Sequence, residues 1–219
     1  ANLENQTLTL RNGGTLTANG TFNPSTSTVI LEGSATLPDP GVSFNNLQIN
    51  TAQDLSGQTI TNTLTLNGSN ASVASTGTPN YGGTATLAYA QGTNLNVPED
   101  EWPANSGPNR VQVLGSTEVT LNADRALSGV GNRALNIDTN ATFTVAAGNT
   151  FAVGNGVAGT ANGDGIFDVQ GTFQIDENGF ALIPPEYGSN STLRYNSGNV
   201  FGRADEWSSK SGSGYPTNV

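Results

Sequence analysis

The chain of 219 residues contains no cysteine, no methionine and no histidine. Without cysteine it has neither disulfides nor thiolate metal sites. Without histidine or cysteine it cannot form a Ser-His-Asp triad or a Cys-His pair, so nucleophilic catalysis of those types is excluded. The missing residues are also the ones most easily oxidised or most prone to bind metals, which suits an exposed, extracellular protein.

Positive charge is scarce as well. Seven Lys and Arg stand against 17 Asp and Glu, which gives a formal net charge of −10 and a pI near 4.1. Nucleic acid and anionic membrane surfaces are bound through Lys and Arg, so both partners are disfavoured. No apolar run approaches the roughly 18 residues of a membrane span. No signal peptide is present, and Ala1 is compatible with being the first residue after its removal.

Uncharged polar residues dominate the composition instead. Gly, Asn and Thr each occur 28 times and, together with 18 Ser, make up nearly half of the chain. Charged residues are only 11%, against roughly 25% in an ordinary globular domain, so hydroxyls and amides must cover the surface. Leu and β-branched residues recur at regular spacing, which favours a thin, regular core over disorder.

Short stretches that alternate polar and apolar residues run along the chain and are typical of half-buried strands. Clusters such as Asn67-Gly68 separate them, and these residues tolerate the positive φ that corners need. No segment has apolar residues at helical spacing for three turns. The expected strands include residues 7–10, 28–31, 47–49, 63–66, 118–121, 142–145 and 172–175.

Three all-β folds fit such strands: a sandwich, a propeller or a parallel β-helix. A sandwich built from hairpins favours two-residue loops and antiparallel pairing. Here strand–corner–strand triplets recur, and residues 8–22 align with 135–151 so that Leu16 matches Phe143. Stacked coils place like residues above like residues. The sequence therefore predicts an elongated, all-β parallel β-helix (β-solenoid), with aliphatic ladders inside and Thr or Asn ladders outside.

The chain also repeats itself. Thr86–Tyr89 leads to an Asp-Glu-Trp motif at 100–102, and Thr192–Tyr195 leads to a second one at 205–207. The shift is 105 or 106 residues here but 72 upstream, where Ile49 matches Leu121, so the second copy carries an insertion of about 34 residues. We predict one continuous solenoid with two duplicated modules. Its parts are N-terminal coils (1–43), a first module (44–111) and a second module (112–219) with an insertion near 145–190.

Paired carboxylates in the Asp-Glu-Trp motifs could serve a glycosidase if they lay about 5 to 9 Å apart. Because the motif occurs twice at equivalent places, we interpret it as a joint between modules rather than as an active site. The chain is therefore predicted not to be an enzyme. The joint residues are Asp100, Glu101, Trp102, Asp205, Glu206 and Trp207.

Residues 162–168 resemble part of a calcium loop. In EF-hand spacing, Asn162, Asp164 and Asp168 take the third, fifth and ninth positions. Thr160 and Gly171 then occupy the first and twelfth positions, so two principal carboxylate ligands are missing. We expect no cofactor, and a turn capped by Asn and Asp is the simpler interpretation, with calcium as the open alternative.

Three segments, residues 22–29, 44–50 and 193–198 followed by 214–219, resemble a recurring module of large secreted proteins of the Bacteroidota. Those proteins resemble adhesins and surface fibres exported by the type IX system. The resemblance implies an extracellular or cell-surface location and a solenoidal, structural or adhesive role. The C-terminal sorting domain usual in that group is missing from this sequence.

Solenoids end in unpaired strand edges, which proteins usually cover with caps. No charged or helical cap is evident at either end of this sequence, and uncapped ends are complementary to each other. Contact between them would be head-to-tail and would not close, which predicts a homo-oligomeric filament. We therefore expect a subunit of an extracellular filament or surface adhesin. The assembly residues are Ala1, Leu3, Tyr215, Pro216 and Val219.

Two other functions stay open. A β-helix that binds or cleaves a surface polysaccharide or glycan needs exposed aromatic residues beside paired carboxylates. An ice-binding solenoid needs Thr-x-Thr pairs stacked on one flat face, and their irregular spacing here argues against it. The candidate aromatic residues are Tyr81, Tyr89, Tyr187, Tyr195 and Tyr215.

Overall fold

The computed structural model describes residues 4–17, 22–38, 41–127, 135–154, 160–161, 165–177, 179–196, 198, 203–208 and 210–219. Contacts divide the chain into a first unit, Ala1–Gln91 with Pro98–Pro108, and a second unit, Gly92–Val97 with Asn109–Val219. In the described ranges all regular structure is β-strand, apart from one 3₁₀ turn, η1 (Asp205–Trp207). No helix in that part of the chain has the length and apolar character needed to cross a membrane.

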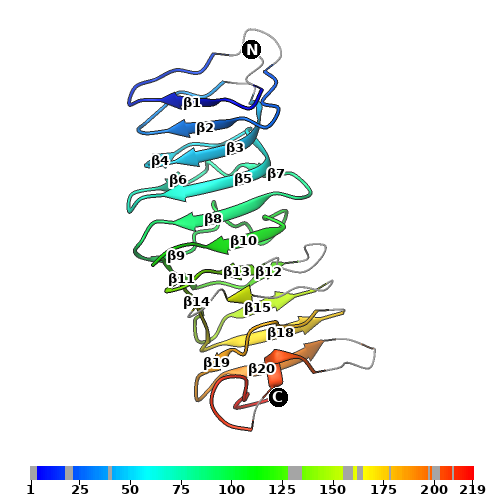
Figure 1. Cartoon of the computed structure of the whole chain (residues 1–219). Coiled ribbons are helices and arrows are strands. Elements are labelled where there is room, and N and C mark those ends of the chain that lie inside the picture. The colour runs from blue at the N-terminus through cyan, green and yellow to red at the C-terminus, as the bar shows by residue number, and fades with distance from the viewer. Residues whose placement is uncertain are drawn as a thin grey trace. The chain divides into compact units, whose positions relative to one another are not determined.

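Strands of the first unit stack in parallel (Figure 1). Five pair in the order β1-β2-β3-β5-β8, while β7 pairs with the start of β5, and β4 pairs with β6. Thr28 lies beside Asn46 and Asn46 beside Thr63, so these two coils take 18 and 17 residues. The strands are β1 (Thr7–Leu10), β2 (Thr28–Leu31), β3 (Ser43–Ile49), β4 (Ala52–Gln53), β5 (Thr59–Asn67), β6 (Ser72–Val73), β7 (Asn80–Tyr81) and β8 (Thr86–Ala90).

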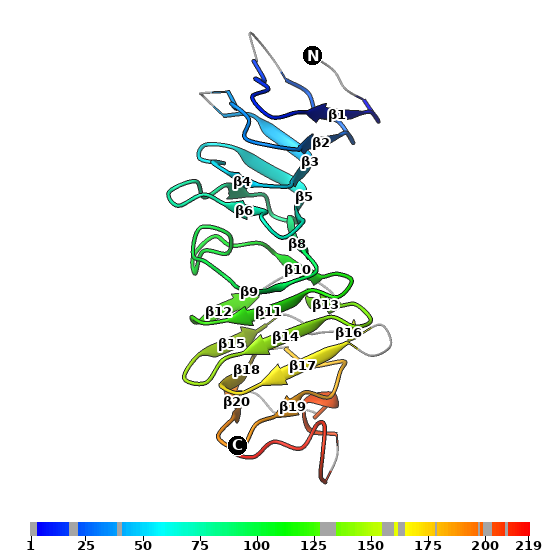
Figure 2. The same cartoon turned by 90° about the vertical axis from the view of Figure 1, so that its left-hand side faces the viewer.

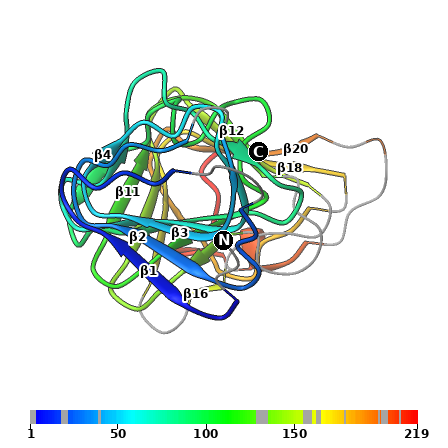
Figure 3. The same cartoon turned by 90° about the horizontal axis from the view of Figure 1, so that it is seen from above.

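Like residues lie above like residues in this unit, as predicted. Alternation sends every second side chain inward, so apolar residues form continuous columns along the stack. Figure 3 looks along the stack and shows the ribbons of β1, β2 and β3 lying over one another. One column faces outward and carries Thr7, Thr28, Asn46 and Thr63. The two inner columns are Leu8-Val29-Leu47-Leu64-Leu87 and Leu10-Leu31-Ile49-Leu66-Tyr89.

The second unit has three parallel sheets, of which two contain β9-β11-β14-β17-β19 and β12-β15-β18-β20 (Figure 2). The third contains β10, β13 and β16. Consecutive strands belong to different sheets. One coil of the chain therefore comprises β10, β11 and β12, with one strand in each sheet, and the next comprises β13, β14 and β15. The strands are β9 (Asn94–Asn96), β10 (Arg110–Val113), β11 (Glu118–Leu121), β12 (Arg125–Leu127), β13 (Leu135–Ile137), β14 (Thr142–Val145), β15 (Thr150–Val153), β16 (Thr160–Ala161), β17 (Ile166–Val169), β18 (Thr172–Asp176), β19 (Glu186–Tyr187) and β20 (Thr192–Asn196).

Four buried phenylalanines form the centre of the second unit. Phe143 lies beside Phe167 on neighbouring strands, and Phe151 lies beside Phe173. Their ring centroids are 5.0 to 6.1 Å apart, the spacing of favourable aromatic pairs. The predicted fold class, an all-β parallel β-solenoid, is confirmed. The two duplicated modules and their boundaries stay a prediction.

Candidate functional site

Glu101, the central residue of the first Asp-Glu-Trp motif, is a buried carboxylate that is only 2% exposed. Its Oε1 accepts a hydrogen bond from the Val73 N–H at 3.3 Å, and the Tyr89 hydroxyl stabilises its charged form. The Tyr81 hydroxyl donates to the Glu101 carbonyl at 2.6 Å. Glu101 therefore ties the segment Pro98–Pro108 to β6, β7 and β8.

Glu206, in the second motif, has the same kind of surroundings in the second unit. Its Oε2 accepts from the Ala181 N–H at 3.0 Å. Its Oε1 accepts from the Ala204 N–H at 2.9 Å and from the Tyr195 hydroxyl at 3.2 Å. The Tyr187 hydroxyl donates to the Glu206 carbonyl at 2.8 Å. In both units, one tyrosine thus binds the glutamate carbonyl and another approaches its carboxylate.

Burial is the main cause of the raised pKa values of Glu101 and of three tyrosines in these clusters. It raises the pKa of Glu101 to about 7, and the nearby charge of Asp100 adds to this, while the Val73 N–H and the Tyr89 hydroxyl act in the opposite direction. Burial also raises the pKa of Tyr81, Tyr187 and Tyr195, and in each case the nearby glutamate adds to the effect. The phenols therefore remain neutral hydrogen-bond donors over the range in which Glu101 titrates.

The other joint residues also make contacts inside their own unit. Asp100 accepts from the Thr76 N–H at 3.2 Å and from the Thr78 hydroxyl at 3.1 Å. Trp102 is fully buried. The Asp205 N–H donates to the Ala181 carbonyl at 3.2 Å. Trp207 is half-buried and lies under Arg203, whose guanidinium carbon is 4.8 Å from the ring centroid.

The calcium prediction falls mostly outside the described residues, because Asn162 and Asp164 are not among them. Asp168 is described and lies in β17, where its carboxylate accepts a hydrogen bond from the Gln170 side chain. Its neighbour across the strand pair is Glu186 in β19. Within the described ranges, no group of three or more Asp or Glu side chains is arranged to hold a metal ion.

Of the predicted assembly residues, Ala1 and Leu3 lie outside the described part of the chain. Tyr215 is 47% exposed and Val219 is 65% exposed, whereas Pro216 is buried. Asn218, between Pro216 and Val219, lies in parallel register with Thr192, and its carbonyl accepts from the Leu193 N–H at 2.9 Å. This last stretch of sequence therefore runs beside β20.

The candidate carbohydrate-stacking tyrosines differ in accessibility. Tyr81, Tyr187 and Tyr195 donate their hydroxyls to the buried glutamates, and Tyr89 is fully buried. Tyr215 alone among the five candidates exposes nearly half of its surface. In the described part of the chain, the four tyrosines beside the two glutamates are thus buried or half-buried, which leaves little ring surface open to a sugar.

The Thr-x-Thr pairs do not form an uninterrupted ladder. The pairs at 7/9 and 63/65 share one sheet of the first unit. Between them lie the coils that carry Thr28 with Ile30 and Asn46 with Gln48 at the same positions. An aliphatic and a long amide side chain break the hydroxyl array, in agreement with the argument from the irregular spacing.

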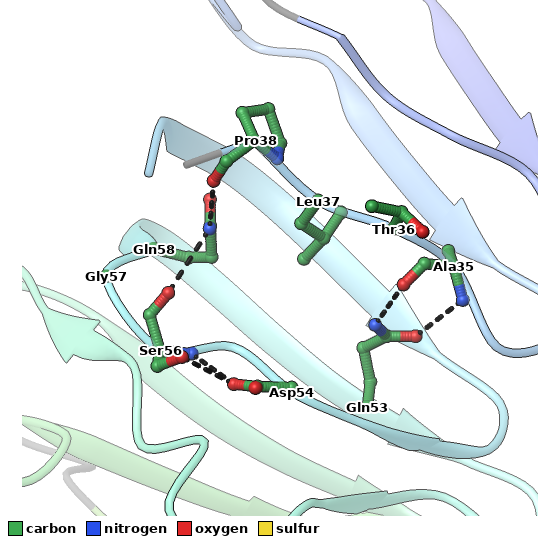
Figure 4. A pocket seen from close by; sticks show the side chains of 9 residues that line it. All are labelled: Ala35, Thr36, Leu37, Pro38, Gln53, Asp54, Ser56, Gly57 and Gln58. Carbon is green, nitrogen blue, oxygen red and sulfur yellow. Dashed lines mark hydrogen bonds between the residues drawn. The ribbon is translucent and has the colours of Figure 1, made fainter. Parts of the chain in front are cut away.

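A cavity of about 580 Å³ in the first unit is spanned by two glutamine side chains (Figure 4). Gln53 bonds to both backbone groups of Ala35, donating at 2.7 Å and accepting at 3.1 Å. Gln58 accepts from the Val42 N–H and donates to the Pro38 carbonyl, both at 3.0 Å. The lining residues are Ala35, Thr36, Leu37, Pro38, Gln53, Asp54, Ser56, Gly57 and Gln58.

The two glutamine side chains thus link their own coil to backbone groups of Ala35, Pro38 and Val42. At the cavity rim, Asp54 accepts from the Ser56 N–H and hydroxyl, which lowers the pKa of its carboxyl. Sequence reasoning missed this arrangement. Both glutamines follow ordinary strand or turn residues, and nothing in the pattern distinguishes a bridging glutamine from an exposed one.

No protein-family model, curated protein or solved structure matches the chain. The resemblance to Bacteroidota surface modules therefore stays a prediction.

Proposed function

We propose that this chain is a structural subunit of an extracellular filament or surface adhesin, in which a further solenoid coil stacks on the open edge of β1. The observation that supports the proposal is that one edge of β1 is unpaired among the described strands. β1 pairs with β2 on one side, and its other side pairs with no strand in the described residues.

The core beneath β1 is incompletely covered. Leu8 and Leu10 are partly exposed, whereas Val29 and Leu31, their neighbours in β2, are 1% and 0% exposed. Leu8 and Val29 belong to one column, and Leu10 and Leu31 to the other. The residues of β1 are more exposed because β1 has a paired strand on one side, whereas β2 lies between β1 and β3. A coil with apolar residues at alternate positions would complete the burial.

The backbone of β1 also has hydrogen-bonding groups directed toward its open side. Gln6 and Leu10 turn their carbonyls to β2, where they accept the N–H groups of Thr28 and Glu32 at 3.0 and 2.9 Å. Bonding directions alternate along a strand, so Thr7 and Thr9 turn their N–H and carbonyl groups to the open side. A parallel strand is the partner that fits, because every neighbouring pair in this sheet is parallel.

The test replaces Thr9 with proline, which removes the outward N–H without removing a bond to β2. Thr9→Val is the matched control, since it keeps that N–H. We expect the unmodified chain and Thr9→Val to form concentration-dependent assemblies by light scattering, with filaments in electron micrographs, and Thr9→Pro to remain monomeric. A monodisperse monomer of the unmodified chain at high concentration would contradict filament formation by neighbouring copies.

A further inference from the structure

We infer that Glu101 is a pH-operated latch on the segment Pro98–Pro108: as a neutral acid it holds the segment on the first unit, and as an anion it releases it. The inference goes beyond the proposed stacking role. It rests on a comparison of two glutamates in equivalent surroundings that differ in how well their charge is compensated.

Glu101 has few donors for a buried carboxylate. Only Oε1 receives a backbone N–H, from Val73 at 3.3 Å, and the second donor is the Tyr89 hydroxyl. Glu206 receives three hydrogen bonds, all between 2.9 and 3.2 Å. A buried carboxylate needs such donors to remain charged, so ionisation is costly at Glu101.

The charged and titratable groups around Glu101 do not offset its charge. Tyr81 from β7 and Tyr89 from β8 are neutral phenols, and β6 offers only the Val73 N–H. Asp100, on the segment itself, is an acidic neighbour fixed by Thr76 and Thr78. No Lys or Arg of the described residues forms a salt bridge with Glu101. The anion would therefore face a carboxylate and two phenols, and within the described residues no salt bridge offsets its charge.

Release follows because water solvates the anion better than this pocket does. The pKa of Glu101 is about 7 when the segment is closed, against an ordinary 4.5 when it is open. The raised value means that the closed state binds the proton more tightly, so closure is favoured at low pH and weakens as pH rises between the two values. Above about pH 7 the weakening is complete.

Hydrogen–deuterium exchange on the intact chain tests the latch, with exchange rates corrected for the intrinsic effect of pH. From the two pKa values, the opening constant of Pro98–Pro108 should rise about 70-fold between pH 5 and pH 8. Glu101→Gln should abolish this rise, because the amide oxygen still accepts from Val73 and carries no charge. Glu206→Gln is the matched control and should leave the rise unchanged.

A latch is ruled out if Glu101→Gln keeps the pH response or if the unmodified chain shows none. A direct measurement covers the case in which Glu101→Gln fails to fold. The side-chain carboxyl carbon of Glu101, followed by ¹³C NMR in the unmodified chain, should titrate near pH 7. Titration near the ordinary value for glutamate would overturn the inference.

Discussion

Replacing Gln53 with leucine removes the two hydrogen bonds that join its side chain to Ala35 in the preceding coil. Nε2 donates to the Ala35 carbonyl at 2.7 Å and Oε1 accepts from the Ala35 N–H at 3.1 Å (Figure 4). Gln53 is only 5% exposed, and leucine has a comparable volume although its side chain is one atom shorter. The substitution therefore tests the hydrogen bonds rather than the filling of space.

The expected loss follows from what remains unpaired. A buried polar group that loses its partner costs about 1–3 kcal/mol, and leucine leaves two such groups on Ala35. Because Ala35 is half-buried and borders the cavity, water can reach it, and the lower part of that range applies. We expect the first unit to lose about 2–3 kcal/mol of unfolding free energy.

A second substitution separates the donor from the acceptor. Gln53→Glu keeps an oxygen for the Ala35 N–H but turns the other carboxylate oxygen toward the Ala35 carbonyl. Only the protonated form can donate there, so the pKa of the new side chain should be raised in the folded state. Its destabilisation should be greatest near pH 7 and should diminish as the pH falls toward 4, where the carboxyl regains its proton.

The two tryptophans make the assay specific to one unit. Trp102 is buried in the first unit and Trp207 lies in the second, so a Trp207→Phe background leaves a fluorophore that reports the first unit alone. The free energies of urea unfolding of the variants are compared, and an unchanged m-value shows that a shift in the midpoint reflects stability. Gln48→Leu is the control, because Gln48 is half-exposed and, among the described residues, its side chain bonds only to that of Asn50. If Gln53→Leu costs no more than Gln48→Leu, the bridging role is refuted.

Two further substitutions test the packing of each unit. Phe167→Ala should destabilise the second unit by about 3–5 kcal/mol in urea unfolding followed by Trp207, because the ring is buried against three others. Its neighbour Ile166 is 39% exposed, and Ile166→Ala should cost less than about 1 kcal/mol; equal losses would contradict the packing argument. Gly41→Ala should lower the melting temperature, since its Cβ would lie 2.1 Å from the Gly57 carbonyl oxygen. Gly83→Ala meets open space and should leave it nearly unchanged, so similar shifts for both would contradict this reasoning.

The sequence was sufficient to predict the fold class because a solenoid depends on a pattern that needs no long-range information. Alternation in Thr63–Leu66 and a following Asn-Gly corner specify a strand with one buried face and a turn. Stacking then places Leu64 beside Leu47 and Leu87. The Asp-Glu-Trp motifs were also recognised as structural candidates, although their place as joints between modules stays a prediction.

The burial of Glu101 and the role of Gln53 could not be predicted in the same way. Glu101 lies outside the strands, so no period indicates which of three adjacent acidic residues points inward. Gln53 is buried in a strand only two residues long, too short for alternation to be recognised. In both cases the partner is a backbone group 18 or 28 residues away, which only the stacking register brings into contact.

The two glutamate clusters show that coils far apart in the sequence can have the same local structure; an insertion between duplicated modules stays a prediction. In the sequence, Ile49 matches Leu121, which lies 72 residues further along the chain. Alternating strands resemble one another closely, so such a match does not define a unique offset between two copies. By contacts, β8 rests on β5 with Leu87 beside Leu64, and β20 rests on β18 with Leu193 beside Phe173. Leu64 lies beside Leu87 near the first cluster, and Phe173 lies beside Leu193 near the second. The two supporting strands, β5 and β18, are therefore 109 residues apart at these equivalent positions. Each coil of a solenoid contacts only its neighbours, so coils added further away do not disturb the tyrosines and backbone amides around either glutamate.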